Sequence, residues 1–340
     1  MDFTPEIEYQ SPEVIRQFQE EKLREQIAYL QVYSPYYKKL FAKHNIDSSK
    51  IEHLEDLRRI PFTTKLDMEK YNEDFLCVPK WRVIDYIFLP GSDGKSVRFA
   101  RTDSDLERLA YNEALAFSCA GLRPGSVIML IPSKDLPSIS QTAYFIGIRK
   151  LKASIIHMDG DDLREKWEAI SDMKPYILMS TPSCILQLLD YADSHGIDYR
   201  QSSVKRIIAI GDALRDHHFE LNSVGKSIKE RWDVDLMATY SSSTMSIIFS
   251  ECECGCGGHH HPELLIVEIV DKNGNPVPTG ETGEVVVTTL GVEGMPLLRL
   301  RTGNMACIHP EPCRCGRNSF RVSPVLSQET TFTTPNPSSF

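Results

Sequence analysis

Short apolar runs alternate with longer amphipathic stretches through the middle of the chain. After VIDYIFLPG at 83–91, the runs VIMLI, ASIIHM, YILMS and RIIAIG each have the length and composition of a buried strand. Between these runs, apolar residues recur at helical spacing over 103–121, 138–152 and 182–195. Short apolar strands that alternate with helices of about 10–15 residues are typical of an α/β fold with a largely parallel sheet.

The regions on either side follow different patterns. Residues 11–44 carry charged and apolar residues at helical spacing, interrupted at Ser34-Pro35, and predict a helical N-terminal region. After about residue 262, the strand-like runs LLIVEIVD, EVVVTTL and LLRLRTG are separated by Gly, Pro and Asn turn sequences without a helical stretch. This pattern predicts an antiparallel or barrel-like appendage to the sheet.

The last stretch, SQETTFTTPNPSSF, is rich in Thr, Ser and Pro and has no apolar periodicity. We expect it to be disordered or loosely attached. The predicted organisation is therefore a helical region at 1–82, an α/β region at 83–261, a β-rich extension with a metal turn at 262–326, and a tail at 327–340.

Charge and composition narrow the function classes. The formal net charge of −9 over 340 residues argues against nucleic acid or an anionic membrane as the main partner. The N-terminus MDFTPEIEYQ lacks the basic and apolar regions of a signal peptide, and no apolar stretch approaches the length of a membrane span. Nine cysteines without a secretory signal indicate a reducing compartment, so we expect a cytoplasmic soluble protein.

Five of the nine cysteines lie in two short stretches, ECECGCGGHHHPE at 251–263 and EPCRCGRN at 311–318. Two cysteine-bearing turns separated by a β segment are a common way to assemble a closed tetrahedral zinc site. One ion cannot use every Cys and His of these stretches, so some histidines are expected to be exposed or to lie outside the ligand shell. The remaining four cysteines are scattered, as core cysteines are.

Three further stretches contain residues suited to nucleotide binding, each with a plainer alternative. LPGSDGKSVRF at 89–99 offers glycine amides, a hydroxyl and an ammonium for a phosphate, yet Ser-Asp-Gly is ordinary turn sequence. AIGDALRD at 209–216 follows a strand end, where open α/β sheets bind ligands, although Asp212 also suits a helix N-cap. TYSSSTM at 239–245 brings a tyrosine and four hydroxyls that suit a base and a hydrated cation, or simply a loop.

Ten motifs follow one another in a fixed order from about residue 30 to residue 326. They are YSPYYKKLF, LRRIPFTTKLDM, GSDGK followed by RTDSDL, STPSCILQLL, IGDAL, TYSSSTM, FSEC…GGHH, TGETGEVVVTTL, LRTGN and CRCGR. In this order they resemble the phenylacetate–CoA ligase family of the adenylate-forming superfamily. Such enzymes join ATP to a carboxylic acid, giving an acyl-adenylate and pyrophosphate, and pass the acyl group to the thiol of coenzyme A. The resemblance implies a large α/β domain with a β-rich extension, followed by a small mobile C-terminal domain.

The resemblance assigns roles to residues at the matching positions. Those that match the phosphate loop are Gly91, Ser92, Gly94 and Lys95, whereas Pro90, Asp93 and Ser96 depart from it. The element that contacts adenine in the family is Gly211, Asp212 and Ala213 here, and the tyrosine element begins at Tyr240 and Ser241. Family spacing selects the metal ligands Cys252, His259, Cys313 and Cys315, with Cys254 and Cys256 left as substitutes.

Three anchor positions differ in the direction of weaker Mg²⁺–ATP binding. Asp93 places a carboxylate in the phosphate loop. Thr244 stands where the family has a Mg²⁺-binding glutamate, and a neutral hydroxyl is a poorer ligand than a carboxylate. Asn304 stands where the family has a ribose-binding aspartate, so it can accept a hydrogen bond but brings no charge.

The match ends at VSPVL (322–326), and the tail occupies the place of the family's hinge. We therefore expect a chain truncated before the mobile C-terminal domain. The resemblance implies ATP, Mg²⁺ and coenzyme A as co-substrates, a structural Zn²⁺, a small aryl or phenylacetate-like acid as substrate, and a homodimer. Two function hypotheses remain: an impaired acid–CoA ligase, or a non-catalytic remnant that binds a ligand or a partner.

Overall fold

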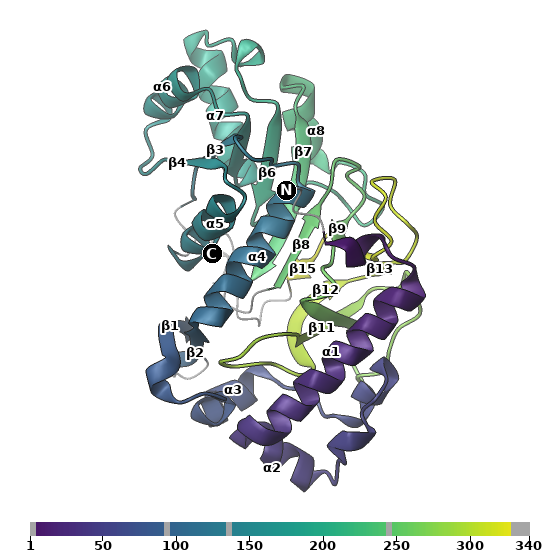
Figure 1. Cartoon of the computed structure of the whole chain (residues 1–340). Coiled ribbons are helices and arrows are strands. Elements are labelled where there is room, and N and C mark those ends of the chain that lie inside the picture. The colour runs from purple at the N-terminus through teal and green to yellow at the C-terminus, as the bar shows by residue number, and fades with distance from the viewer. Residues whose placement is uncertain (1–4, 92–95, 134–137, 243–246, 328–340) are drawn as a thin grey trace.

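The apolar runs in the middle of the chain pair as parallel strands in the computed structural model, which describes residues 5–91, 96–133, 138–242 and 247–327 (Figure 1). Their order is β4–β3–β5–β6–β7. The bounds are Val127–Leu130 for β3, Ser154–His157 for β4, Ile177–Ser180 for β5, Arg206–Ile210 for β6 and Asp235–Ser242 for β7. The predicted α/β fold with parallel strands is therefore confirmed.

Helices cover both faces of these parallel strands, which is why the strands are continuous apolar runs. On β3, Ile128 and Leu130 pack toward α4 and α5, whereas Met129 lies in the core under α6, α7 and α8. The bounds are Asp103–Cys119 for α4, Ser138–Lys150 for α5, Leu163–Met173 for α6, Pro182–His195 for α7 and Ser223–Arg231 for α8.

The sheet continues from β7 with antiparallel strands in the order β8–β9–β14–β13, giving a nine-stranded mixed sheet within the described residues. The bounds are Ile247–Glu251 for β8, Gly258–His259 for β9, Ile308–His309 for β13 and Arg321–Val322 for β14. Both predicted cysteine-bearing stretches lie at this antiparallel end, one between β8 and β9 and the other between β13 and β14.

The β-rich extension is an antiparallel four-stranded sheet in the order β10–β11–β12–β15. The bounds are Leu265–Val270, Gly283–Thr289, Leu300–Ala306 and Leu326–Ser327. Within the described residues its outer strands β10 and β15 do not pair with each other, so the sheet is open rather than closed into a barrel. Of the two predicted forms, the antiparallel one is thus the one observed.

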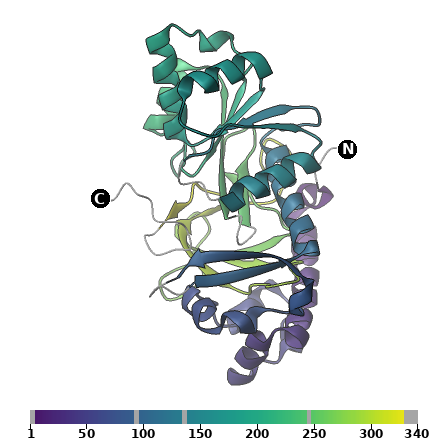
Figure 2. The same cartoon turned by 90° about the vertical axis from the view of Figure 1, so that its left-hand side faces the viewer.

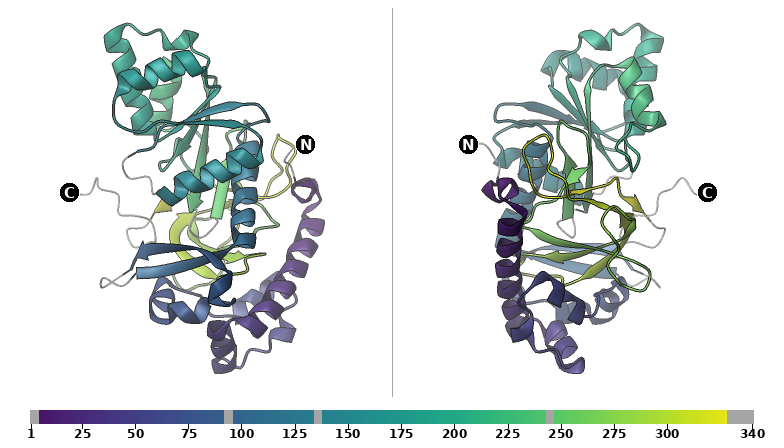
Figure 3. Two further views of the ribbon diagram at one scale, coloured as in Figure 1. Left: turned by 60° about the vertical axis from the view of Figure 1, so that its left-hand side comes forward. Right: turned by 90° about the vertical axis from the view of Figure 1, so that its right-hand side faces the viewer.

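The four-stranded sheet lies between helix α1 and a β-hairpin (Figure 3). Helix α1 (Pro12–Tyr33) ends at Ser34, which also caps α2 (Pro35–Lys43) by accepting a hydrogen bond from the Tyr37 amide at 3.3 Å. The predicted break at Ser34-Pro35 is therefore confirmed. After α3 (Lys65–Tyr71), β1 (Val83–Pro90) and β2 (Ser96–Thr102) form the hairpin, seen edge-on in Figure 2.

The apolar run at 83–91 is thus a strand of a separate two-stranded sheet, not a neighbour of the parallel strands. One face of β1 packs into the core through Ile87, while Ile84, Tyr86 and Phe88 are exposed on the other. No helix in the described part of the chain has the length and hydropathy needed to span a bilayer. The predicted tail lies outside the described residues from residue 328 onward.

Candidate functional site

The four predicted metal ligands meet at the antiparallel end of the large sheet. Cys252 follows β8, His259 lies on β9, and Cys313 and Cys315 lie in the turn between β13 and β14. One ligand atom from each lies within 4.8 Å of all the others. We call this group the Cys/His cluster. Its members are distant in sequence, so the cluster joins two turns of the sheet.

The spacing of the cluster suits a zinc ion. Cys252 Sγ lies 3.7 Å from Cys313 Sγ, and Cys315 Sγ lies 3.5 Å from His259 Nε2. Tetrahedral zinc with ordinary bond lengths separates two sulfur ligands by about 3.8 Å and a sulfur from a nitrogen by about 3.6 Å. The donor set of three thiols and one imidazole, largely buried, is that of a closed structural site.

The pKa shifts in the cluster differ from one thiol to another: the hydrogen bond with Cys315 and burial raise the pKa of Cys252, and burial raises the pKa of Cys313. The hydrogen bond with Cys252, followed by that with His259, lowers the pKa of the Cys315 thiol. Burial lowers the pKa of His259, which favours the neutral imidazole that binds metals. The Cys254 amide also donates to Cys252 Sγ at 3.4 Å, which orients that sulfur.

The two substitute cysteines lie beside the cluster and are less buried than Cys252. Cys256 Sγ is 3.6 Å from Cys313 Sγ, but neither Cys254 nor Cys256 is among the four residues whose ligand atoms all approach one another. The folded chain therefore places Cys252 in the Cys/His cluster, the residue that family spacing selects, and Cys256 contacts the cluster through Cys313.

The two neighbouring histidines are both buried rather than exposed. His260 stacks on Phe320 with ring centroids 3.6 Å apart, and burial lowers its pKa to about 3. His261 Nδ1 lies 2.5 Å from Glu8 Oε1, and the second oxygen of Glu8 accepts from Arg317 Nε at 2.6 Å. Of the two predicted alternatives, these histidines are therefore not exposed but lie outside the four-residue group.

Glu8 and Arg317 support the cluster. Arg317 is the last residue of the CRCGR motif, whereas no sequence motif pointed to Glu8. Arg317 Nη1 lies 3.5 Å from Cys315 Sγ, and its guanidinium lies over the Tyr9 ring. Burial alone would raise the pKa of Glu8, but the charges of and hydrogen bonds from His261 and Arg317 outweigh it and lower that pKa. The 3₁₀ helix Glu6–Tyr9 is thereby fixed to the second cysteine turn.

The residues predicted to contact adenine, together with Tyr240, lie at the carboxyl ends of two parallel strands, β6 and β7. Gly211 follows β6 with φ +85, so an L side chain would be strained at this turn, and Asp212 and Ala213 come directly after it. Since Ile210 pairs with Thr239, Gly211 lies beside Tyr240 at this edge of the sheet.

Tyr240 on β7 meets Asn304 on β12, so the contact joins the two sheets. Asn304 Nδ2 donates to the Tyr240 hydroxyl oxygen at 2.6 Å. Burial raises the pKa of Tyr240, and the bond to Asn304 partly offsets it. Asn304 Oδ1 is buried and has no hydrogen-bond partner among the described residues. A buried acceptor without a partner is rare in folded proteins, so this oxygen is suited to a ligand donor.

Of the remaining residues predicted for the phosphate loop and for magnesium, only some are described by the structure. Gly91 follows β1, and the backbone of Ser241 pairs with Ile248. Ser92, Gly94, Lys95 and Thr244 lie outside the described residues. A cavity of about 200 Å³ lies beside the β1–β2 hairpin, lined by residues such as Leu76, Tyr86 and Met295 and by none of the predicted site residues.

Proteins named phenylacetate-coenzyme A ligase are similar in sequence to this chain. The chain is 28% identical to "Phenylacetate-coenzyme A ligase" of Thermus thermophilus over 333 residues, which are 96% of the chain and 73% of the relative. It is 26% identical to the protein of the same name from Escherichia coli, covering 93% of the chain and 72% of the relative. No protein-family model matches the chain.

Solved structures of adenylate-forming ligases share the fold. The chain superimposes on 2-hydroxyisobutyryl-CoA ligase in complex with 2-HIB-AMP and CoA with a TM-score of 0.84 and 20% identity, covering 95% of this chain and 70% of that one. An open conformation of the same ligase gives a TM-score of 0.81. The chain is therefore similar in sequence to phenylacetate–coenzyme A ligases along nearly all of its length, and it shares its fold with a solved CoA ligase.

Proposed function

We propose that this chain activates a small carboxylic acid with ATP to an acyl-adenylate and transfers the acyl group to coenzyme A. The observation that carries the proposal is the similarity to phenylacetate–CoA ligases along 96% of the chain. The fold neighbour solved with an acyl-adenylate and CoA supports it. The substrate class proposed is an aryl or phenylacetate-like acid, after the names of the relatives.

The residues at the strand ends would hold the adenosine part of the nucleotide. The unpartnered Asn304 Oδ1 would accept a hydrogen bond from a ribose hydroxyl. Gly211 lets the backbone turn sharply beside Tyr240, whose ring is held parallel to Phe249 at 5.8 Å. Gly91, Ser92, Gly94 and Lys95 would cradle the phosphates, and a Mg²⁺ ion would accompany ATP, with Thr244 at the place of the family's carboxylate ligand.

A zinc ion is proposed for the Cys/His cluster, with a structural and not a catalytic part. All four positions of a tetrahedral ion would be filled by Cys252, His259, Cys313 and Cys315, which leaves no open position for a substrate. Such an ion supplies a cross-link between the two cysteine turns. The homodimer and the cytoplasmic location implied earlier belong to the same proposal.

The test is acid-dependent exchange of pyrophosphate into ATP by the purified chain. With Mg²⁺ and a panel of aryl and alkyl acids, we expect exchange with at least one acid, strongest for arylacetates. Asn304→Ala removes the acceptor and the contact to Tyr240, and it should lower the exchange about tenfold or more. Exchange no higher than in the absence of acid, for every acid of the panel, would contradict catalysis by this chain.

A second function, binding of an acyl-adenylate without turnover, is favoured by the neutral side chains at two anchor positions. Asn304 brings an amide where the resemblance has a carboxylate, and Thr244 brings a hydroxyl. Titration calorimetry with a non-hydrolysable acyl-sulfamoyl adenosine separates the two functions. Tight binding of this analogue combined with no exchange supports the non-catalytic function.

A further inference from the structure

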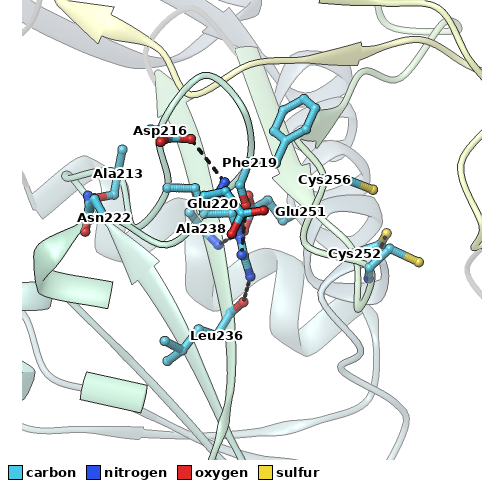
Figure 4. Close-up of polar contacts among 12 residues, drawn as sticks. Ala213, Asp216, Phe219, Glu220, Asn222, Leu236, Ala238, Glu251, Cys252 and Cys256 are labelled. Carbon is cyan, nitrogen blue, oxygen red and sulfur yellow. Dashed lines mark hydrogen bonds and ion pairs between the residues drawn. The ribbon is translucent and has the colours of Figure 1, made fainter. Parts of the chain in front are cut away.

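The loop that carries the adenine-contacting element is closed upon itself by hydrogen bonds. It runs from Gly211 to Asn222, between β6 and α8. Asp216 Oδ1 accepts from the amides of His218 at 2.9 Å and Glu220 at 3.1 Å, and Asn222 Nδ2 donates to the Ala213 carbonyl at 2.7 Å. Figure 4 shows the Asp216 side chain bonded back to the backbone of its own loop. These internal bonds shape the loop but do not fix its position on the sheet.

Leu214 is buried in the core beneath the loop, and the side chain that bonds the loop to the neighbouring strands is Arg215. Arg215 Nη1 donates to the Phe219 carbonyl at 3.1 Å within the loop, and Nη2 donates to the Leu236 carbonyl of β7 at 3.3 Å. Its Nε lies 3.4 Å from Glu251 Oε1 on β8. The guanidinium fork thus joins the loop to two strands at once.

Glu251 is the last residue of β8 and leads into the first cysteine turn, which runs from Cys252 to Gly257. It precedes Cys252 directly and accepts from the Ala238 amide of β7 at 2.9 Å. Its side chain is 4% exposed and that of Arg215 is 17% exposed, so the pair is largely shielded from water. Replacing a buried ion pair by apolar residues is often neutral for stability, whereas such a pair can fix one arrangement of its elements.

The loop also lies directly on the backbone of the cysteine turn. A Cβ at Gly255 would lie 2.4 Å from Arg215 Nη2, and one at Gly257 would lie 2.8 Å from the Phe219 ring. Both glycines have positive φ, at +58 and +97. The backbone of the turn, without side chains at these two glycines, therefore contacts Arg215 and Phe219. Figure 4 shows Phe219 beside Cys256 of this turn.

We propose that Arg215 is a positioning residue for nucleotide binding, which holds the Gly211–Asn222 loop against the first cysteine turn through Glu251. The proposal rests on the proposed function, since it assigns the loop to the adenosine part of the nucleotide. It means that the arrangement of the cysteine turn sets the position of the loop. A disturbance at the Cys/His cluster would then weaken nucleotide binding without any cluster residue touching the nucleotide.

The experiment compares Arg215→Met with the wild type and with Arg231→Met in the full chain. Arg231 is a matched control, because its guanidinium also bridges acidic side chains, Asp190 at 2.8 Å and Asp193 at 2.7 Å, but on helices away from the loop. Two properties are measured: backbone amide exchange over residues 211–222, and the affinity for AMP by calorimetry. Arg215→Lys keeps the charge with one point of contact, so it guards against a Met variant that fails to fold.

For Arg215→Met we expect amide exchange in the loop to rise about tenfold and the AMP dissociation constant to rise about tenfold. Arg215→Lys should fall between this variant and the wild type, and Arg231→Met should change neither quantity. If the enzyme turns over, the KM for ATP should rise while kcat stays within about twofold.

The outcomes separate this proposal from the proposed function. Unchanged amide exchange in the loop of Arg215→Met overturns the positioning role. Faster exchange with unchanged AMP affinity overturns its link to nucleotide binding. A wild-type chain that binds no AMP contradicts the proposed function, and the amide exchange then still decides whether Arg215 fixes the loop.

Discussion

The Cys/His cluster and the strand ends proposed to bind the nucleotide differ in how far folding alone assembles them. In the cluster, four ligand atoms already lie within 4.8 Å of one another. At the strand ends, the described contact is a single bond between Asn304 and Tyr240, and an acceptor on Asn304 is left without a partner. The four ligand atoms of the first group thus lie together in the folded chain, whereas the second group keeps an acceptor that no described residue pairs.

This difference follows from the chemistry that each group serves. A zinc site needs soft donors at fixed positions, so residue identity cannot vary much. A nucleotide site at strand ends uses backbone amides and local turn geometry, so residues such as Asp212 and Ala213 can replace others at little cost. The departures from the pattern of the resembling family, such as Asp93, Thr244 and Asn304, fall among the residues implied for nucleotide binding and not in the cluster.

The most direct way to break this comparison is Cys313→Ser. Cys313 touches both Cys252 and Cys256, so its loss removes the central sulfur of the cluster. We expect one equivalent of zinc to be lost and the free energy of unfolding to fall by more than about 4 kcal/mol, because metal binding is coupled to folding. Elemental analysis and denaturant unfolding measure both, with Cys184→Ser as the control outside the cluster. A wild-type chain that is stable and free of metal would show that the cluster is no metal site.

Glu8→Gln tests whether the N-terminal 3₁₀ helix supports the cluster. The change leaves Arg317 and His261 without a charged partner in a buried position, so we expect a loss of about 2–4 kcal/mol in unfolding free energy. Glu6→Gln, exposed on the same helix, should cost little. An equal loss from both variants would contradict a specific role of Glu8.

The stability difference between wild type and Glu8→Gln should also depend on pH. The pKa of Glu8 is lower in the folded chain than in the unfolded chain, so its contribution is fully present above the unfolded value of about 4.3. That contribution is lost as the pH falls through the folded value. The difference in stability between wild type and Glu8→Gln should therefore be constant near neutrality and shrink below about pH 4. A difference that does not shrink in acid would show that the carboxylate charge is not its cause.

The sequence predicted the elements whose cause is local. The parallel strands are buried on both faces, so each is a continuous apolar run, and helix α7 begins and ends at its predicted residues because Thr181 caps one end and Gly196 the other. Helix α6 was not predicted. Its apolar residues Leu163, Trp167 and Ile170 do recur at helical spacing, so the helix was open to prediction from the sequence.

Long-range partners explain what the sequence could not predict. Glu8 lies 253 residues from His261 and 309 from Arg317, so no local spacing links them. The run at 83–91 is as apolar as the core strands, but it is half-exposed because it pairs only with β2. The four cluster residues could be chosen in advance because the family resemblance selects them from two cysteine-bearing stretches, whereas Arg215 is one arginine among many.

A smaller effect, on AMP affinity, is expected from Asn304→Asp, which tests whether Asn304 Oδ1 faces a donor of the nucleotide. The carboxylate would restore the charge that the resemblance places at the ribose, and charge-assisted hydrogen bonds are roughly twice as strong as neutral ones. We expect AMP to bind about tenfold more tightly, measured by calorimetry, with little change in zinc content. Asn45→Asp, on an exposed turn, controls for the added charge. Weaker AMP binding by Asn304→Asp would show that Oδ1 does not face a donor of the ligand.

The smallest effect should come from Cys254→Ser, which asks whether the first cysteine turn has one ligand or several. Cys254 is only partly buried, and its described role is that of its backbone amide, which donates to Cys252 Sγ. The serine keeps that amide, so we expect the same zinc content as wild type and a change of less than about 0.5 kcal/mol in unfolding free energy. Cys252→Ser is the matched comparison, and it should lose the metal as Cys313→Ser does. If Cys254→Ser loses zinc and Cys252→Ser keeps it, then Cys254 and not Cys252 is the ligand. The turn would then bind the ion in a different arrangement from the one that buries Cys252.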